Sequence, residues 1–311
     1  MRVVSLFSGI GGLDKGFEEA GYSVIWANDF DKYAVQTYKA NYENEIVFGD
    51  INEIPLRDIP DAEILIGGFP CQPFSMMGGQ KGFEDARGTL FFRIAEIIKE
   101  KIDRGHKPAA VILENVKALK THDQGRTFAT IKRILEEDLG YKVYSDILNS
   151  AEHGVPQTRN RTYIVCFANK NAEFTFPEKE NLDRTLQDIL EQDVDQKYFL
   201  SEKILPTILS NGTGGYKAKS EIDLKVARPL CATMAKMHRA CQDNYVTQKG
   251  RIRRLTPREC ARLQGFSDDF MIPVSDCQAY KQFGNAVTVN VSRAVAVAVK
   301  ESLQNIGEWN D

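Results

Sequence analysis

A single cysteine stands between two prolines in the segment GGFPCQPFS, residues 67–75. Pro70 and Pro73 disfavour the helical conformation for the residues that precede them, so the backbone around Cys71 is held extended. A cysteine that only packs needs no such restraint. Cys71 could therefore be a structural thiol, a metal ligand or a nucleophile, and the restraint of its loop argues against a thiol that only packs.

A carboxylate lies near the end of an apolar run, in PAAVILENV at residues 108–116. This run predicts a strand with Glu114 at its carboxyl end, and AEILIGG predicts another strand just before the Cys71 loop. Asp29 and Asp50 end two further predicted strands, YSVIWAND and EIVFGDI. Ligands of open parallel sheets lie beyond the carboxyl ends of the strands, so these residues are expected along one edge of a sheet.

A glycine-rich turn, FSGIGGLDKG, follows the first predicted strand, RVVSLF, and leads into a helix. It is not the dinucleotide fingerprint, because Asp14 replaces the third glycine. Asp29 nevertheless follows Gly11 by eighteen positions, where an acceptor for a ribose hydroxyl is expected. The turn therefore predicts an adenosine-bearing cofactor other than NAD, and S-adenosylmethionine, which has no pyrophosphate, needs no third glycine.

Predicted strands and helices alternate through residue 168, which indicates a doubly wound, mainly parallel α/β sheet. After residue 170 the alternation weakens, and a second, less regular domain is expected. The C-terminal stretch from Ala279 to Leu303 predicts one amphipathic helix that returns to the first domain. The other expected helices and strands are helices at 31–42, 89–102 and 127–140, and strands at 141–150 and 161–168.

The composition is that of a globular protein with 311 residues, of which 42% are hydrophobic and 27% charged. Neither a signal peptide nor a long apolar run is present in the sequence, so a soluble, cytoplasmic protein is expected. The six cysteines form no C-x-x-C pair and the four histidines are not spaced like zinc ligands, so no metal is expected and a reducing compartment suits the thiols.

Charge is distributed unevenly along the chain. From Tyr216 to Arg262 there are twelve Lys or Arg residues and four Asp or Glu residues, a local net charge of +8 that leaves −11 for the rest. This segment is either a solvated charged face or a surface that contacts phosphates.

Six motifs resemble, in the same order, those of the DNA cytosine-5 methyltransferases of the bacterial or phage restriction-modification type. They are FSGIGGL, GGFPCQPFS, ENV at 114–116, QTRNR at 157–161, RLTPRECARLQGF at 254–266 and YKQFGNAV at 280–287. The resemblance covers most of the chain, and PRECARLQGF is its most specific part. It implies a Rossmann-like methyltransferase sheet formed by residues 1–188 plus 278–311, with a smaller target-recognition domain at 189–277. It also implies S-adenosylmethionine as cofactor and double-stranded DNA as partner.

The implied reaction is transfer of a methyl group to carbon 5 of a cytosine that has been flipped out of the duplex. Cys71 would attack carbon 6, which makes carbon 5 nucleophilic. Glu114 would donate a proton to ring nitrogen 3, which requires a raised pKa. Arg159 and Arg161 match the arginines that hold the target base and its surroundings.

The resemblance also assigns binding residues position by position. Two residues near the expected cofactor differ from those usual in the family. Ser8 stands where alanine is common, and Asp29 stands where glutamate is frequent. The cofactor residues are Phe7, Gly9, Gly11, Leu13, Asp29, Phe30, Asp50, Ile51, Pro70, Leu90, Asn285 and Val287. The residues expected to contact DNA are Gln72, Ser75, Thr233, Arg239 and Arg253.

Three other functions remain open at this point. A transfer-RNA cytosine-5 methyltransferase shares the catalytic loop, although its Cys-Phe-Thr tripeptide is absent here. A nicotinamide dehydrogenase shares the sheet but explains neither PCQ nor the missing glycine. A catalytically silent DNA-binding module would not need Cys71 and Glu114. The expected enzyme is a monomer that works in the prokaryotic cytoplasm in association with the nucleoid, and a companion restriction endonuclease would act on the same site.

Overall fold

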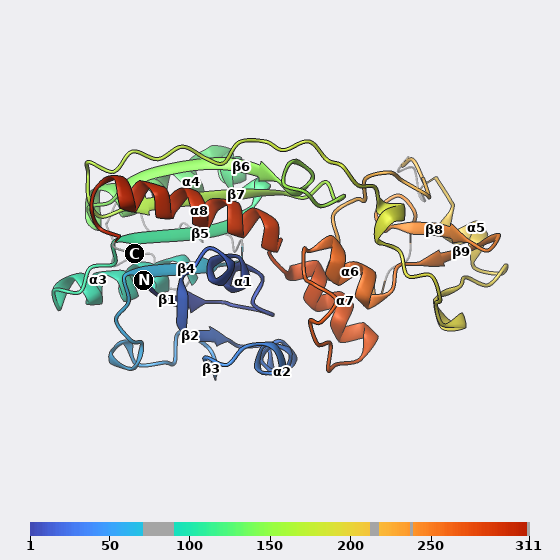
Figure 1. Ribbon diagram of the computed structural model, residues 1–311, viewed down its shortest axis with the longest axis horizontal. Helices are drawn as coiled ribbons and strands as arrows, with labels where there is room; N and C mark the ends of the chain where they lie inside the picture. Colours follow the sequence, from blue (N-terminus) through green and yellow to red (C-terminus); the bar gives the residue numbers. More distant parts are fainter. Residues whose placement is uncertain (71–89, 212–217, 237–238, 310–311) are drawn as a thin grey trace.

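The computed structural model describes residues 1–70, 90–211, 218–236 and 239–309. Within these ranges the main sheet has seven strands in the order β3-β2-β1-β4-β5-β7-β6 (Figure 1). Neighbouring strands from β3 to β5 run parallel, whereas β7 is antiparallel to both β5 and β6. The predicted doubly wound, mainly parallel sheet is therefore confirmed. Its strands are β1 (Arg2–Leu6), β2 (Ser23–Asp29), β3 (Glu45–Phe48), β4 (Ile64–Gly68), β5 (Ala110–Val116), β6 (Lys142–Asn149) and β7 (Asn160–Phe167).

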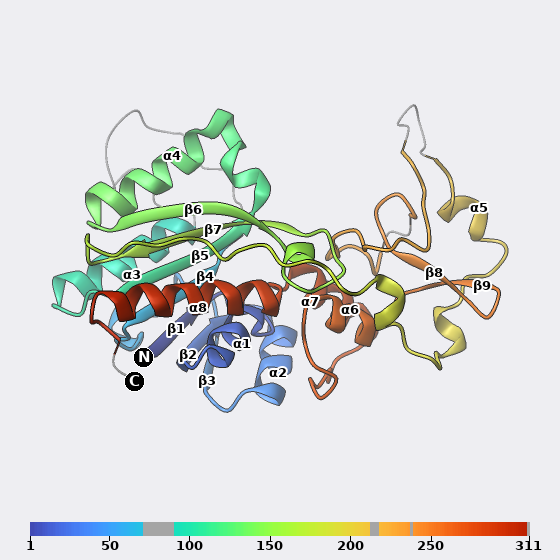
Figure 2. The ribbon, with the colours of Figure 1, turned by 45° about the horizontal axis from the view of Figure 1, so that its top comes forward.

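Helices cover both faces of this sheet because its central strands are apolar on both sides. In β5, Val111 and Leu113 contribute to one hydrophobic cluster, and Ala110 and Ile112 contribute to another. Side chains alternate between faces along a strand, so a strand that is apolar at successive positions must be covered twice. The first cluster includes α3 (Leu90–Asp103) and α4 (Arg126–Arg133), and the second includes α1 (Gly12–Glu19) and α8 (Val289–Asn305), as Figure 2 shows.

The C-terminal segment contains two helices, so the prediction of one continuous helix was wrong. Helix α7 (Asp276–Asn285) ends before Ala286, whose ψ of 153° is extended, and α8 begins at Val289. The carbonyls of Gly284 and Ala286 accept hydrogen bonds from the guanidinium of Arg159. The expected return to the first domain is confirmed, because α8 packs on α1 and Ser292 donates to the carbonyl of Leu13.

A third hydrophobic cluster connects the sheet domain with the rest of the chain. It contains Ala34 and Tyr38 of α2 (Lys32–Asn41), Cys260 and Leu263 of α6 (Pro257–Leu263), and Phe283 of α7. Beyond α6 and α7 lies a small two-stranded sheet of β8 (Tyr245–Gln248) and β9 (Arg251–Arg254), near the short helix α5 (Leu205–Ile208) (Figure 1). This outer part has its own small hydrophobic cluster of Ile208, Ala240 and Tyr245. Of the helices described, none combines the length and the apolar character that crossing a membrane requires.

Candidate active site

A cavity of about 800 Å³ lies at the carboxyl ends of the parallel strands. Glu114, Arg159 and Arg161 line it together with the residues predicted to bind the cofactor, apart from Gly11. The tertiary structure therefore brings the cofactor residues and the acid into one space. The predicted cofactor residues in its wall are Phe7, Gly9, Leu13, Asp29, Phe30, Asp50, Ile51, Pro70, Leu90, Asn285 and Val287.

The glycine turn after β1 is held by the end of β2. The carboxylate of Asp29 accepts hydrogen bonds from the backbone N–H groups of Gly9 and Asp31, each at 2.8 Å. Phe7 adopts a left-handed φ of 55°, which is uncommon for an aromatic residue and is found mainly at functional sites. Burial raises the pKa of Asp29. Each of its carboxylate oxygens keeps a lone pair, so Asp29 can still accept a ligand hydroxyl.

Gly11 does not line the cavity, so its predicted direct role is not supported. Its φ of 80° places it in the left-handed region that favours glycine, at the start of α1. The hydroxyl of Tyr42 donates to its carbonyl at 2.7 Å, and a Cβ on Gly11 would lie 2.5 Å from that ring. Gly11 therefore shapes the turn and contacts Tyr42 instead of the cavity.

One end of the cavity is built from an exposed ring and a carboxylate. Phe30 is 70% exposed although it is a large apolar side chain. Asp50 is exposed, and its carboxylate accepts from the backbone and side-chain N–H groups of Asn52, while Ile51 beside it is buried. A flat apolar ring and a hydrogen-bond acceptor are what an adenosine moiety needs for stacking and for recognition of its polar edge.

Asp14 lies beneath the cofactor turn in a buried polar network that the sequence did not predict. Its carboxylate accepts hydrogen bonds from the hydroxyls of Ser5 at 2.9 Å and Tyr38 at 2.8 Å. Ser8, whose side chain borders the cavity, donates in turn to the hydroxyl of Ser5. Burial, with a smaller contribution from Glu18, raises the pKa of Asp14 to about 7 against the hydrogen bonds from Tyr38 and Ser5. The network connects α1 and α2 to the floor of the cavity.

Replacing Asp14 with asparagine is expected to remove a pH dependence of stability. In the unfolded chain the carboxyl ionises above about pH 4, whereas in the folded protein it stays protonated up to about pH 7. The wild-type protein therefore loses about 2 kcal/mol through this group between pH 5 and pH 7.5, and Asp14→Asn does not. Urea unfolding of both proteins at the two pH values measures this difference, and a difference that does not change with pH would contradict the assignment.

The candidate acid, Glu114, is paired with Arg161 across two antiparallel strands. Arg161 lies opposite Val116 on the neighbouring strand, which puts its side chain diagonal to Glu114 on the same face. The Arg161 Nε lies 3.0 Å from Glu114 Oε1. Burial raises the pKa of Glu114, although Arg161 and Arg159 act in the opposite direction. A buried carboxyl with a raised pKa beside a guanidinium can hold a proton and pass it to a base.

The start of the candidate nucleophile loop is fixed by Asn115, to which the sequence assigned no separate role. Its side-chain amide is buried and donates to the carbonyl of Phe69 at 2.8 Å. Pro70 follows in the cavity wall. Cys71, Gln72 and Ser75 lie outside the described residues, so their predicted roles remain predictions.

Arg159 borders the cavity, but its two terminal nitrogens bind main-chain carbonyls, and its role of holding the target base stays a prediction. It is 1% exposed, and its guanidinium donates to the carbonyls of Leu230, Gly284 and Ala286 at 3.0, 3.0 and 2.7 Å. Burial lowers its pKa to about 9. Because its two terminal nitrogens are used by main-chain carbonyls, Arg159 holds three segments together.

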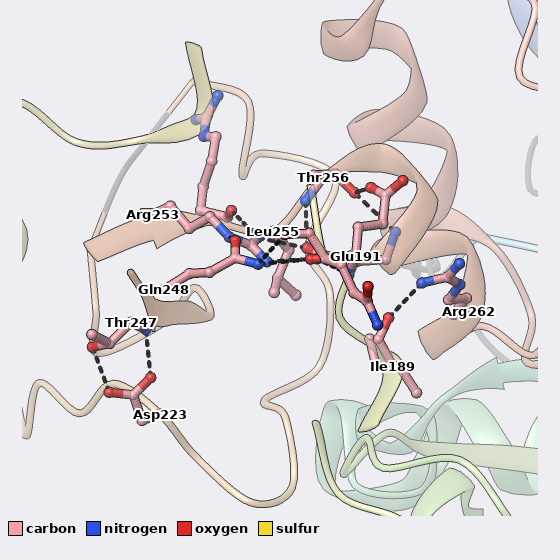
Figure 3. A network of polar contacts seen from close by, with 12 residues as sticks. Ile189, Glu191, Asp223, Thr247, Gln248, Arg253, Leu255, Thr256 and Arg262 are labelled. Carbon is pink, nitrogen blue, oxygen red and sulfur yellow. Dashed lines mark hydrogen bonds and ion pairs between the residues drawn. The ribbon is translucent and has the colours of Figure 1, made fainter. Parts of the chain in front are cut away.

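Arg253 is fully buried, so the prediction that it contacts DNA was wrong. Figure 3 shows its side chain directed into a polar network, where it donates to both carboxylate oxygens of Glu259 at 2.8 and 2.7 Å and to Gln248 at 2.6 Å. Glu259 also accepts from the backbone N–H groups of Glu191 and Thr256. A buried guanidinium needs a paired carboxylate, and this pair fixes β9 to α6 and to the chain near residue 191.

Several other arginines in the basic segment 216–262 also serve the protein's own structure. Arg228 donates to the carbonyls of Glu221 and Ala240, and Arg262 pairs with Asp268. Thr233 is exposed, whereas Arg239 is half-buried and donates to Ser210. The local charge of +8 therefore overstates how much of the segment is available to phosphates. Within the described ranges, His, Cys, Asp and Glu form no group of three that could hold a metal ion.

Comparisons with known proteins agree with this arrangement. A family model described as C-5 cytosine-specific DNA methylase matches residues 1–301. The Type II methyltransferase M.NlaX of Neisseria lactamica is 43% identical over 321 aligned positions, which cover 99% of this chain and 98% of the relative. The Type II methyltransferase M.SsoII of Shigella sonnei is 45% identical over 98% of this chain and 81% of its own length.

Solved structures show the same fold at much lower identity. A methyltransferase of Entamoeba histolytica, EhMeth, superposes with a TM-score of 0.78 at 19% identity, and the alignment covers 99% of each chain. A prophage-encoded protein of E. coli, named as a putative DNA modification methyltransferase, superposes with a TM-score of 0.72 at 19% identity, over 98% of this chain and 99% of that one. These similarities extend across both the sheet domain and the smaller outer part.

Proposed function

The chain belongs to the C-5 cytosine-specific DNA methylases and is a DNA cytosine-5 methyltransferase, and from this premise we propose its cofactor, its mechanism and the division of labour between its two parts. The observation that carries the proposal is the shared cavity, in which the Glu114–Arg161 pair lies beside the residues suited to an adenosine-bearing ligand. The transfer-RNA alternative is disfavoured, because the relatives with high identity are Type II enzymes.

The cofactor is S-adenosylmethionine, and the cavity fits it. Asp29 would accept a ribose hydroxyl, Phe30 would stack on the adenine, and Asp50 with Ile51 would contact the edge of the adenine. Asn285 and Val287 would close the opposite wall. When bound, the cofactor supplies a methyl group on a positively charged sulfur, which a carbon nucleophile can attack.

The mechanism assigns covalent chemistry to Cys71 and acid chemistry to Glu114. The Cys71 thiolate adds to carbon 6 of cytosine, and Glu114 donates its proton to ring nitrogen 3, so carbon 5 becomes an enamine carbon that accepts the methyl group. Loss of the carbon-5 proton to water then expels the Cys71 thiolate, and nitrogen 3 returns its proton to the Glu114 carboxylate, which restores both the ring and the acid. Arg161 holds the Glu114 carboxyl in place at 3.0 Å and remains available to the base because it is only partly buried.

The target cytosine must leave the duplex to reach this cavity. Carbon 6 and nitrogen 3 are hidden within a stacked base pair, and extrusion costs on the order of a few kcal/mol. The basic smaller part, residues 189–277, would hold the phosphates meanwhile, with Thr233 and Arg239 as candidates for DNA contact. The enzyme works as a monomer, and a restriction endonuclease for the same site accompanies it, as the Type II names of its relatives suggest for their own systems.

Sequence choice is expected to lie within residues 189–253. Helix α6 shares a hydrophobic cluster with α2 and α7, so the chain after residue 254 packs on the sheet domain and is not expected to contact DNA bases. DNA from a host that expresses the protein is sequenced by a method sensitive to 5-methylcytosine, and methylation at one short motif is the expected result. A chimera that carries segment 189–253 of a relative with a different target should methylate the relative's motif.

Two results would contradict this proposal. An expressed, folded wild-type protein that leaves host DNA without 5-methylcytosine would overturn the proposed activity. An active chimera that keeps the parental motif would show that recognition lies outside 189–253. Single substitutions refine the map, because loss of a base-reading residue relaxes one position at about 1–3 kcal/mol, whereas loss of a phosphate contact weakens binding to all duplexes.

A further inference from the structure

Gln157 is a fully buried polar residue that the proposed mechanism does not use. It lies between β6 and β7, just before Arg159. Its side-chain oxygen accepts from the backbone N–H of Leu230 at 2.8 Å, and its amide nitrogen donates to the carbonyl of Leu263 at 2.7 Å. One glutamine therefore joins the end of α6 to a segment of the smaller domain.

Arg159 also binds Leu230, the residue that Gln157 contacts. Its guanidinium donates to the carbonyl of Leu230 at 3.0 Å, so Gln157 and Arg159 together bind both backbone polar groups of Leu230. Backbone hydrogen bonds extend the contact, from the N–H of Thr158 to the carbonyl of Ala227 at 2.9 Å and from the N–H of Ala227 to the carbonyl of Pro156 at 2.7 Å. Segment 227–230 is thus laid along segment 156–159.

The other side of this segment presses against α7. A Cβ placed on Gly284 would lie 2.2 Å from the backbone nitrogen of Ala232, so only glycine permits this approach. Arg159 also holds the carbonyl of Gly284 at 3.0 Å. The chain then reaches Thr233, which is exposed. Segment 227–232 has no freedom to slide without breaking these contacts.

Gln157 and Arg159, which hold this segment, are close in sequence to Arg161 of the Glu114–Arg161 pair. Arg161, two residues after Arg159 on β7, is the partner of Glu114. Any shift of segment 227–232 therefore changes its position relative to the acid. We propose that Gln157, together with Arg159, is a positioning residue that fixes the register between segment 227–233 of the smaller domain and Glu114, so that a base is delivered correctly only when the right sequence is bound. This inference rests on the proposed function.

The test compares two buried glutamines. Gln157→Met removes the hydrogen bonds to Leu230 and Leu263 with little change in volume. Gln264→Met is the matched control, because Gln264 is equally buried and donates to the carbonyl of Phe283 at 2.6 Å, and its described hydrogen bonds do not reach segment 227–233. Arg159→Lys is a second variant, since one ammonium cannot serve three carbonyls in the guanidinium's geometry.

Two readouts are measured on the full-length protein. Hydrogen exchange followed by mass spectrometry reports the protection of the peptide that contains Leu230. The second readout is a ratio of kcat/KM values, that for a duplex with the mapped target divided by that for duplexes with one substituted base pair. This ratio reports the register between segment 227–233 and Glu114. Gln157→Met and Arg159→Lys are expected to lose protection in this peptide and to lower the ratio about tenfold, whereas Gln264→Met should leave both unchanged.

Three outcomes would overturn the inference. They are unchanged protection in Gln157→Met, lost protection with an unchanged ratio, and equal changes in the Gln264→Met control. The thermal midpoint of each variant shows whether folding was preserved, and Arg159→Lys decides the matter if Gln157→Met does not fold. A wild-type protein that methylates no duplex would instead overturn the proposed function, and the exchange data still show whether Gln157 holds the segment.

Discussion

Replacement of Cys71 with alanine is expected to abolish methyl transfer and to leave cofactor binding nearly intact. Without a thiolate at carbon 6, carbon 5 of cytosine remains part of a delocalised ring and does not attack a methyl group. Most of the proposed cofactor contacts lie on other elements, namely the β1 turn, the ends of β2 and β3 and the end of α7. Transfer of a radiolabelled methyl group to duplex DNA and titration of cofactor binding measure the two properties separately.

A mechanism-based trap provides the control for this variant. A duplex with 5-fluorocytosine at the target should become covalently attached to the wild-type protein, because fluorine on carbon 5 cannot leave as a proton. Cys71→Ala should form no such complex. Covalent capture of the alanine variant would show that another residue performs the addition, and the assignment of Cys71 would fail.

Glu114→Gln is expected to slow methylation by about 10² or more while substrate binding persists. The glutamine keeps the size of the side chain and its oxygen can still accept from Arg161, but its amide N–H is too weak an acid to transfer a proton to the ring. Burial raises the pKa of Glu114, so the wild-type enzyme should lose this acid function as the pH rises through that value. The glutamine variant should lack this pH dependence. Single-turnover rates across pH measure both effects.

An exposed carboxylate offers the comparison for Glu114. Asp146 lies on the edge strand β6, and its described contact is with the backbone N–H of its neighbour Ile147. Asp146→Asn removes one negative charge from the same sheet and should leave the rate unchanged. Near-normal turnover by Glu114→Gln would exclude the proposed acid, and an equal loss in both variants would indicate a general effect of charge.

The fold was predictable because its signals are local. β5 is apolar at four successive positions, Ala110 to Leu113, and such a run has to be buried on both faces of a sheet. Glycines and prolines marked the turns, and strands alternated with helices, so the doubly wound order followed. The prediction of one helix over 279–303 was wrong. The carbonyls of Gly284 and Ala286, where the two helices are separated, bind Arg159, and no local pattern reveals such a distant partner.

Residue types and spacing were enough to identify the chemical groups of this protein: a restrained cysteine, an acid at a strand end, a glycine turn followed by an acidic residue, and a basic second segment. Which polar residues are buried became apparent from the fold. Arg253 and Arg161 both lie on strands, yet Arg253 is buried against Glu259 and Arg161 borders the cavity beside Glu114. The physical reason is that an ion or an amide can be buried only where partners satisfy it, and here those partners lie on other elements of the chain. Asp14, Gln157 and Arg159 owe their positions to such contacts, so their roles followed from the fold and not from their place in a motif.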